Sequence, residues 1–465
     1  MATRSDQLHS HQFALQRVVA AVALRDPDAP TSSLRRAGAA LLAGTMVAAL
    51  GLAAFGIYGL LRPGGGDAWR DGASVIIEKE SGARFVYREG LLHPVLNYSS
   101  ALLILGTPNP PSAHVARAGL VGVPRGVPLG IPGAPDLLPA PADLLPAPWT
   151  ICSRRPVPPV AAAAAESVLL IGAPPPASEP LRDRGLLARD ATGGLHLIWN
   201  ARRHPVTAED LLQPAFGWSP QAAVPVATAV LNAVPAGAEL GRVLVERASK
   251  PSAVEGYRVG EVFVVQTASG ARTFGVARPD GLSDITQVQA DLLLADGANG
   301  PGGRATDMGQ ARYASAPRSA SLVPSGTGAP PETTPDLARV DERSGLCAAY
   351  DDGATAPELT LATNPPRPPG EVRPGSAPGD LTGPVDWVAV PPGRGALVES
   401  LAGPGAAGGA LAVVSDLGQR FPLANRETLA PLGYADVRPI RMPAAVVALL
   451  PAGSALDATA ALTPA

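Results

Sequence analysis

Two distant segments of the chain share one pattern, "VLNAVPAGAEL" at residues 230–240 and "VVALLPAGSAL" at residues 446–456. Pro235 and Gly237 of the first fall in register with Pro451 and Gly453 of the second. A pattern that recurs at a distance indicates a repeated unit, and such units are sought before single elements are assigned. The shared Pro-Ala-Gly turn therefore decides how the rest of the sequence is divided.

A second pattern precedes these segments and occurs four times. It reads "SGARFVYREGLLHPVLNYSSALLILG" from residue 81, "GGLHLIWNARRHPVTAEDLLQPAFGW" from 193, "SGARTFGVARPDGLSDITQVQADLLLADG" from 269 and "GQRFPLANRETLAPLGYADVRPIRMP" from 418. The first part of each predicts short strands and the Leu-containing part a short helix. For the first unit we assign "GIPGAPDLLP" (130–139) as the Pro-Gly half, and for the third we find none. The sequence therefore predicts four small α/β repeats.

Val-rich stretches between the repeats predict a shared, mostly β central domain. No single repeat is rich enough in apolar residues to bury a large core alone, so neighbours or a common centre must help. Pro- and Gly-rich residues 299–335 and 364–380 have few apolar side chains to offset the entropy of ordering, and we expect disorder there. The candidates for central strands are "PAPWTICSRRP" (146–156), "AAAAESVLLIGAP" (162–174), "GRVLVERAS" (241–249), "LCAAY" (346–350) and "VDWVAVPPGRGALVES" (385–400).

The uncharged stretch "AGAALLAGTMVAALGLAAFGIYGLL" (37–61) predicts one transmembrane helix, bracketed by Arg36 and Arg62. A helix of this length spans about 37 Å, more than the roughly 30 Å of a bilayer's hydrocarbon core. Basic residues favour the N-terminal side, so we expect residues 1–36 in the cytoplasm and the remainder outside. In the tail, apolar residues at near-helical spacing predict an amphipathic helix that Asp6 would cap. That helix could pack on partner proteins or remain solvated.

Composition and motifs exclude several classes of function. The net charge is −3 and basic residues form no stripe, so nucleic acid is not an expected partner. The only lysines, Lys79 and Lys250, do not follow a glycine, which rules out the Gly-x-x-x-x-Gly-Lys-Ser/Thr nucleotide-binding loop. The six histidines lack metal-ligand spacing. We predict no catalytic, cofactor-binding or metal residues, and no enzyme activity.

The chain resembles a known family in its tail, anchor and first repeat. The segments "ATRSDQLHSHQFALQRVVAAVALRDPD", "LRRAGAALLAG" and "GARFVYREGLLHPVLNYSSALLILG", with two distant cysteines, are similar to EccB of the actinobacterial type VII (ESX) secretion system. The resemblance implies a core subunit of an inner-membrane secretion complex, with an EccC-like ATPase, an EccD-like channel subunit and a mycosin protease as partners. It also implies an elongated outer region of four repeats around a central domain. Family members are sometimes labelled ATPases.

Cys152 and Cys347 are the only cysteines of the chain. Beyond the membrane, thiols oxidise readily, and an even cysteine count favours a bridge. A metal site would need more ligands than two distant cysteines supply. A reactive thiol needs a neighbour such as His or Lys that lowers its pKa, and no His or Lys lies close to Cys152 or Cys347 in the sequence. The two cysteines also match the disulfide pair of the family that the chain resembles, and we expect them to be joined.

These observations predict an α+β protein with one N-terminal transmembrane helix and an elongated extracytoplasmic region. We expect a structural, self-associating subunit of a type VII secretion machine in the inner membrane; an anchored ATP hydrolase of the same system and a cell-wall-binding protein are the alternatives. The expected segments are a cytoplasmic tail (1–36), the membrane helix (37–61), repeat 1 (73–140), central segments (141–185, 241–257 and 336–394), repeat 2 (186–240), repeat 3 (258–298), a disordered loop (299–335) and repeat 4 (395–462).

Overall fold

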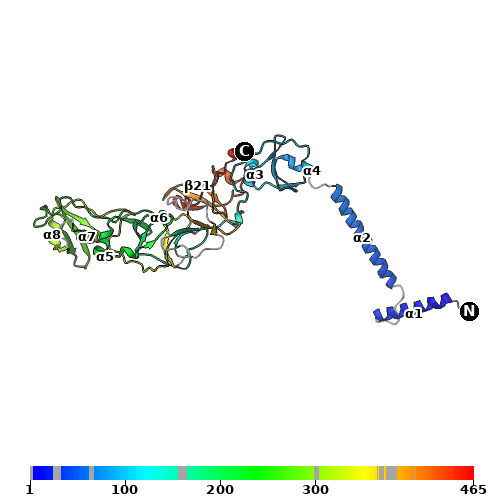
Figure 1. Ribbon diagram of the computed structural model, residues 1–465, viewed down its shortest axis with the longest axis horizontal. Coiled ribbons are helices and arrows are strands. Elements are labelled where there is room, and N and C mark those ends of the chain that lie inside the picture. The colour runs from blue at the N-terminus through cyan, green and yellow to red at the C-terminus, as the bar shows by residue number, and fades with distance from the viewer. Residues whose placement is uncertain are drawn as a thin grey trace.

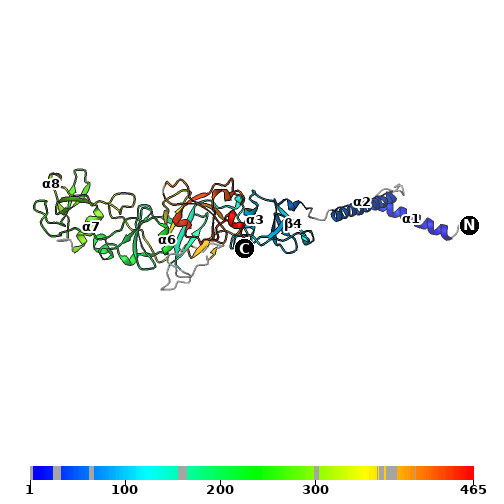
Figure 2. The ribbon, with the colours of Figure 1, turned by 90° about the horizontal axis from the view of Figure 1, so that it is seen from above.

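The computed structural model describes residues 4–24, 33–61, 67–155, 165–297, 303–363, 365, 371–372, 385–403 and 405–465. Beyond the N-terminal helices the chain forms an elongated rod (Figures 1 and 2). Repeat 1 lies nearest the anchor, repeat 4 and the central sheet follow, repeat 2 comes next, and repeat 3 forms the far end. The chain thus runs outward along the rod and returns, and its C-terminus lies beside repeat 1, where the Ala465 N–H donates to the Pro128 carbonyl at 3.0 Å.

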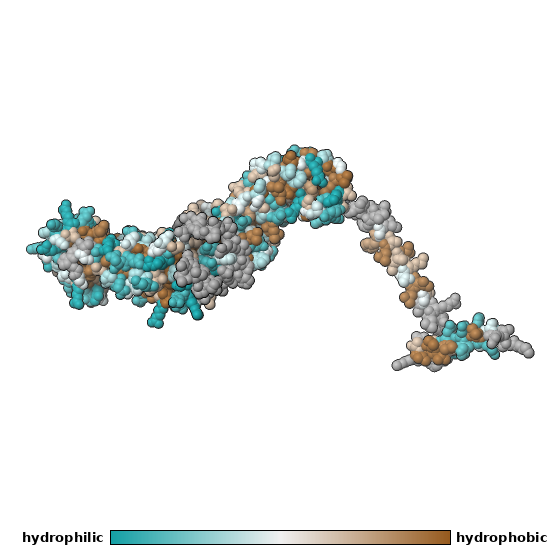
Figure 3. Space-filling view, viewed as in Figure 1, coloured by the Kyte–Doolittle hydropathy of each residue, from teal (hydrophilic) through white to brown (hydrophobic). Residues whose placement is uncertain are grey.

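Two helices precede the rod, α1 (Arg4–Leu24) and α2 (Ser33–Leu61). Within α2, residues Gly38–Gly56 are long and apolar enough to cross a membrane, and Figure 3 shows this helix as mostly hydrophobic. Arg36 lies near the start of α2, and Arg62 falls outside the described residues. The expectation that Asp6 caps α1 is wrong, because the helix already begins at Arg4 and Asp6 stands in its first turn.

All four repeats contain the same four-stranded sheet. Three antiparallel strands are followed by a helix, and a fourth strand then pairs in parallel with the first. Repeat 1 contains η1 (Asp67–Asp71), β1 (Val75–Glu78), β2 (Arg84–Arg88), β3 (Leu91–Pro94), α3 (Tyr98–Leu105), β4 (Ser112–Val115) and α4 (Arg117–Leu120). Repeat 2 contains β8 (Leu186–Arg189), β9 (Leu195–Trp199), β10 (Arg202–Val206), η3 (Glu209–Leu211), α5 (Leu212–Phe216), η4 (Pro220–Ala222), β11 (Val224–Pro225) and α6 (Thr228–Ala233).

The two later repeats keep the order of elements. Repeat 3 contains β12 (Val262–Gln266), β13 (Arg272–Arg278), β14 (Gly281–Ile285), α7 (Gln287–Ala295), β15 (Thr306–Asp307) and α8 (Gln310–Ser315). Repeat 4 contains β20 (Ala396–Leu401), β21 (Ala410–Val414), β22 (Arg420–Pro422), η6 (Arg426–Leu429), β23 (Ile440–Pro443), α9 (Ala444–Val447) and α10 (Ala458–Ala461). The predicted four α/β repeats are therefore confirmed.

Polar caps mark the step from strand to helix in three of the repeats. Asn97, Thr286 and Asn425 each accept a hydrogen bond from the backbone N–H three residues further on. Such a cap satisfies one of the donors that a helix start leaves free, so the helix begins at a fixed residue. The side chain of Gln289 also accepts from the Thr286 N–H, which completes a capping box at the start of α7.

The central domain is a seven-stranded sheet. Its order is β18 (Glu371–Val372), β19 (Trp387–Ala389), β6 (Glu166–Leu170), β5 (Trp149–Arg154), β16 (Ser344–Tyr350), β17 (Glu358–Thr363) and β7 (Ser178–Pro180). The middle strand β5 is buried at all six residues. It comes from the outward limb of the chain, whereas its neighbour β16 comes from the returning limb. The expectation of a mostly β centre is confirmed.

Hydrophobic cores continue across the boundaries between modules. One cluster contains Trp149 of the central sheet, Ile198 of repeat 2 and Val398 of repeat 4. A second joins Val86 of repeat 1 to Phe421 of repeat 4. A third joins repeat 2 to α7 of repeat 3 and contains, among others, Leu197, Val288 and Leu292. Sharing of this kind explains how units of so few residues stay folded, since a small unit alone buries too little apolar surface.

Two expectations about the segments on either side of repeat 3 are wrong. Residues 241–257 give no strand to the central sheet; Val245 instead packs with Val259 and Val276 in the core of repeat 3. The stretch 299–335 is not a disordered loop where the structure describes it, from residue 303 onward: it forms β15 and α8 and buries Met308 in repeat 3. The few apolar residues there suffice because repeat 3 supplies the rest of the core. Of the stretch 364–380, only residues 365, 371 and 372 are described.

Candidate functional site

A disulfide joins the two limbs of the chain at the middle of the central sheet. Cys152 of β5 and Cys347 of β16 face each other in the antiparallel ladder, with Cα atoms 4.1 Å apart, and form the bond. Both side chains are fully buried, and the bond closes a sequence separation of 195. Because repeats 2 and 3 lie within this closed loop, the bond fixes the base from which the distal half of the rod extends.

Two buried tyrosines hold the joints on either side of the centre. The Tyr350 hydroxyl of β16 donates to the Ala233 carbonyl of α6 at 2.6 Å, which links the central sheet to repeat 2. The Tyr434 hydroxyl of repeat 4 donates to the Pro139 carbonyl at 2.6 Å, which links it to the chain that leaves repeat 1. Burial raises the pKa of both hydroxyls, so they stay protonated donors. No sequence signal distinguished these two tyrosines from the other five in the chain.

The Pro-Ala-Gly turns of repeats 2 and 4 run beside the third strand of their sheets and form isolated parallel bridges with it. In repeat 2 the Arg203 N–H donates to the Pro235 carbonyl at 2.9 Å, and the Gly237 N–H donates to the Arg203 carbonyl at 2.8 Å. In repeat 4, Arg420 makes the same two bonds with Pro451 (2.9 Å) and Gly453 (2.8 Å). A Cβ atom on Gly237 or Gly453 would lie 2.3 Å from the buried ring of His204 or Phe421, so glycine is required for this close approach.

Repeats 1 and 3 have the same turn, at residues that the sequence patterns did not identify. In repeat 1, Leu92 bonds to Pro124 and Gly126 (2.8 and 3.1 Å); in repeat 3, Leu282 bonds to Pro317 and Ser319 (2.7 and 2.8 Å). The assignment of 130–139 as the second half of repeat 1 is therefore wrong, as is the statement that repeat 3 lacks this half. A Pro-x-Gly/Ser-x-x-Leu register, which ends at Leu129, Leu240, Leu322 and Leu456, was the available signal.

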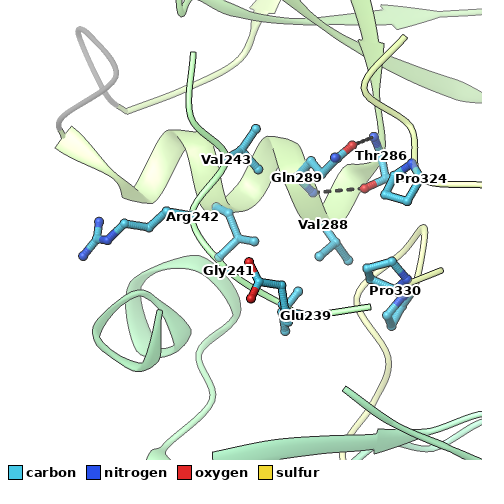
Figure 4. A pocket seen from close by; sticks show the side chains of 12 residues that line it. Glu239, Gly241, Arg242, Val243, Thr286, Val288, Gln289, Pro324 and Pro330 are labelled. Atoms are coloured by element: carbon cyan, nitrogen blue, oxygen red, sulfur yellow. Dashed lines mark hydrogen bonds between the residues drawn. The ribbon is translucent and has the colours of Figure 1, made fainter. Parts of the chain in front are cut away.

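A cavity of about 180 Å³ lies between repeats 2 and 3 (Figure 4). Val288 and Pro330 give it apolar walls, and Glu239 is among the residues that line it. Arg242 points away from it and forms ion pairs with Asp210 and Asp296, the latter at 2.9 Å. The dashed lines in Figure 4 mark the capping box of Thr286 and Gln289. The cavity marks the joint between the two distal repeats.

A second cavity, of about 320 Å³, lies where repeat 2, the central sheet and repeat 4 meet. Tyr350, Pro235 and Pro443 are among its lining residues, and Arg203 is the one charged side chain there. Its volume is at the lower end of the range for small-molecule sites, about 300–1,000 Å³. The lining contains no pair of residues that could act as nucleophile and base.

The carboxyl of Asp190, whose pKa is strongly lowered, belongs to a hairpin turn. Burial of Asp190 raises its pKa, but hydrogen bonds from Thr192, His196 and the Gly194 N–H outweigh burial and bring the pKa to about 2. These bonds close the hairpin between β8 and β9, with the His196 Nε2 atom 3.1 Å from the carboxylate. Among the described residues, no group of three or more His, Cys, Asp or Glu side chains could hold a metal ion.

Comparison with known proteins decides the family. A family model described as "Type VII secretion system ESX-1, transport TM domain B" matches residues 1–465. The chain belongs to the EccB family. The resemblance seen in the tail, anchor and first repeat is thereby confirmed along the whole length.

Several named EccB proteins are similar to this EccB chain over nearly all of it. "ESX-3 secretion system ATPase EccB3" of Mycolicibacterium smegmatis is 29% identical, over 97% of this chain and 88% of its own length. "ESX-2 secretion system ATPase EccB2" of Mycobacterium tuberculosis is 30% identical, over 98% and 94%.

Solved structures share the fold. A chain of "Structure of EccB3 dimer from the ESX-3 core complex" superposes with a TM-score of 0.63 at 26% identity, over 84% of this chain and 99% of that one. A chain of "Structure of an intact ESX-5 inner membrane complex, Composite C3 model" superposes with a TM-score of 0.65 at 23% identity, over 100% and 96%.

The relatives' names contain the word ATPase, but neither lysine of this EccB chain stands where a nucleotide-binding lysine would. Lys79 lies in the turn after β1, and Lys250 lies in a turn that precedes repeat 3; both are exposed. Neither follows a glycine-rich loop at the N-terminus of a helix, where nucleotide phosphates bind. This EccB chain instead presents an anchor, a rod and a disulfide-bonded centre.

Proposed function

We propose that this chain is a structural subunit of a type VII protein secretion complex, anchored in the membrane by α2 and bracing the complex with its rod. The main support for this role is the continuity of the rod. At each boundary between neighbouring modules, a hydrophobic cluster contains residues from both sides. The disulfide and the two tyrosine hydrogen bonds reinforce the centre of the same body. A stiff element with one end at the membrane suits a bracing role.

We place residues 1–36 in the cytoplasm and the rod outside it. The excess of basic residues before the apolar span supports this orientation. The Cys152–Cys347 bond supports it independently, because disulfides persist in oxidising compartments and are rare in the cytosol. The exposed apolar side chains Phe13, Leu15 and Val18 of α1 are then available to cytoplasmic parts of the complex.

The proposed partners are an EccC-like ATPase, an EccD-like channel subunit, a mycosin protease and a second copy of the chain. Support for self-association comes from the similar structure titled as an EccB3 dimer. Support for a larger assembly comes from the fold shared with a chain of an ESX-5 inner membrane complex.

An ATP hydrolase is the second candidate, because relatives carry that name. We favour a purely structural role, since the sequence has no nucleotide-binding loop. The purified full-length protein in detergent should show no saturable binding of radiolabelled ATP at micromolar concentration. Saturable binding that a nonhydrolysable ATP analogue displaces would favour the hydrolase.

The structural role is tested by purification from gently solubilised membranes through an affinity tag at the C-terminus. We expect EccC- and EccD-like proteins in the eluate, in amounts comparable with the tagged chain. A matched control carries the tag on an unrelated single-pass membrane protein. Recovery of the chain alone, or with cell-wall fragments only, would overturn the proposal.

A further inference from the structure

The membrane-proximal end of repeat 1 presents an exposed apolar loop. Residues 118–128, "AGLVGVPRGVP", contain one charged residue, Arg125. Val121 is 75% exposed and Val127 is 53% exposed. Figure 1 places α4, which leads into this loop, at the end of repeat 1 nearest α2, and Figure 2 places β4 toward the same end. Exposed apolar side chains that gather on one loop mark contacts with proteins or membranes more often than singly scattered ones do.

A tight turn holds Val121 outward. Val121 (φ −64°, ψ 133°) and Gly122 (φ 83°) have the conformations of a type II turn, and the Val123 N–H donates to the Leu120 carbonyl at 3.4 Å. Leu120 is buried in the same cluster as Trp69. The base of the turn is therefore fixed in the core of repeat 1, while the Val121 side chain at its tip stays in solvent.

The same element is used differently in the other repeats. In repeats 2 and 4, helices α6 and α9 bury Val230, Leu231, Val446 and Val447 in the cluster that joins the modules. In repeat 3, α8 is polar ("QARYAS") and buries no residue. Among these four described elements, the one in repeat 1 is apolar at its end and yet uncovered. Its Leu120 packs with Trp69, whereas Val121, the next residue, belongs to none of the hydrophobic clusters that the described residues form.

The tether to α2 identifies what lies next to this loop. Residues 62–66 join Leu61 at the end of α2 to Asp67, and six extended links reach at most about 22 Å. Trp69 follows two residues later and shares a core with Leu120. A bilayer spanned by α2 thus lies close to the loop, whichever side of the membrane the rod occupies.

We propose that loop 118–128 of repeat 1 rests on the bilayer surface, with the Val121 side chain inserted at the boundary between lipid headgroups and acyl chains. The contact rests on apolar burial, because the charges around the loop are of both signs: Glu78 and Glu80 face Arg117, and Arg125 within the loop lies near Glu78. Arg117 pairs with Glu78 at 2.8 Å, and Glu80 accepts the Arg117 backbone N–H at 2.8 Å. Contact with lipid at this point fixes the angle at which the rod leaves the membrane.

The test places a solvent-sensitive fluorophore on Val121→Cys in the full-length protein, reconstituted in phosphatidylcholine nanodiscs with and without spin-labelled lipid. We expect a blue-shifted emission and at least a twofold quenching by the spin label. The matched control is Leu244→Cys near repeat 3, which is 81% exposed and should remain unquenched. Adding anionic lipid should leave both values unchanged. The native cysteines are buried and bonded, so one free thiol per chain verifies correct pairing.

Equal quenching at the two positions, or none at Val121, would overturn the proposal. Protection of the Val121 label from aqueous iodide without lipid quenching would also overturn it, because a protein surface would then cover the loop. Quenching that appears only with anionic lipid would contradict an apolar contact. If Val121→Cys does not fold, Val127→Cys serves as the second reporter on the same loop, with the same expected outcome.

Discussion

Removal of the Cys152–Cys347 bond gives the sharpest test of how the rod is held together. The change is the double variant Cys152→Ala and Cys347→Ala in the full-length protein. In the chain-entropy description, closing a loop of this separation stabilises the folded state by up to about 5 kcal/mol. Since about 1.4 kcal/mol corresponds to a tenfold change, opening of the central sheet should become more frequent by as much as about three and a half orders of magnitude.

Hydrogen–deuterium exchange in detergent, read by mass spectrometry, measures this opening directly. Peptides that cover β5 and β16 should exchange much faster in the variant, because these two strands carry the cysteines and pair with each other. Peptides that cover β13 and β14 of repeat 3 serve as the internal reference, since local openings of that distal sheet do not separate β5 from β16. Wild-type protein that was unfolded, reduced and refolded should behave like the variant.

Unchanged exchange of β5 and β16 in the double variant would refute the reasoning. So would an equal increase in β5, β16 and the distal reference, because a uniform change would indicate general destabilisation and not the loss of a central constraint. The double variant itself should not respond to reductant. A response there would mean that reductant acts on something other than this bond.

Three further predictions concern the joints and turns. Gly453→Ala should lower the free energy of unfolding, measured with denaturant, by about 1–3 kcal/mol, because the new Cβ would lie 2.3 Å from the buried Phe421 ring. Gly126→Ala should lower it less, because the His93 ring that the new Cβ meets is partly exposed and can move. Tyr350→Phe should lower the free energy of unfolding by about 1–2 kcal/mol, since the Ala233 carbonyl loses its donor; equal denaturation midpoints would contradict this. Burial lowers the pKa of His204 below its ordinary value, so the folded state loses stability as the pH falls below about 6.5. His204→Phe should remove that loss of stability between pH 7 and pH 5. An unchanged pH dependence of the unfolding free energy in this variant would argue against the reasoning.

The repeat pattern was readable from the sequence because it depends on local chemistry. A Pro-x-Gly turn needs a residue without a Cβ beside a ring, and strand and helix periods are visible within a few residues. The same reasoning missed the turns at Pro124 and Pro317. "VPRGVPL" keeps the proline, glycine and leucine of "VPAGAEL" but differs at the positions between them, and "APRSASL" replaces the glycine as well. Ser319 takes the place of glycine in repeat 3, where the residue that corresponds to His204 and Phe421 is Ser283, which has no ring.

Long-range contacts were less predictable. The pairing of β5 with β16 across the length of two repeats followed from cysteine count and compartment and not from any strand pattern. The hydrogen bonds of Tyr350 and Tyr434 depend on which modules meet, which composition does not encode. Residues 303–335 were expected to be disordered because their own apolar content is low, yet side chains such as Met308 find a core that repeat 3 supplies. Local sequence therefore predicted the units, and the joints between units required the structure.

One measurement tests the structural role most directly. Native gel electrophoresis of solubilised membranes gives the size of the complex that contains the EccD-like subunit, with and without the gene for this chain. If the chain braces the complex, its loss should reduce the complex to smaller species, and re-expression of the full-length protein should restore the original size. A complex of unchanged size in cells without the chain would contradict the account.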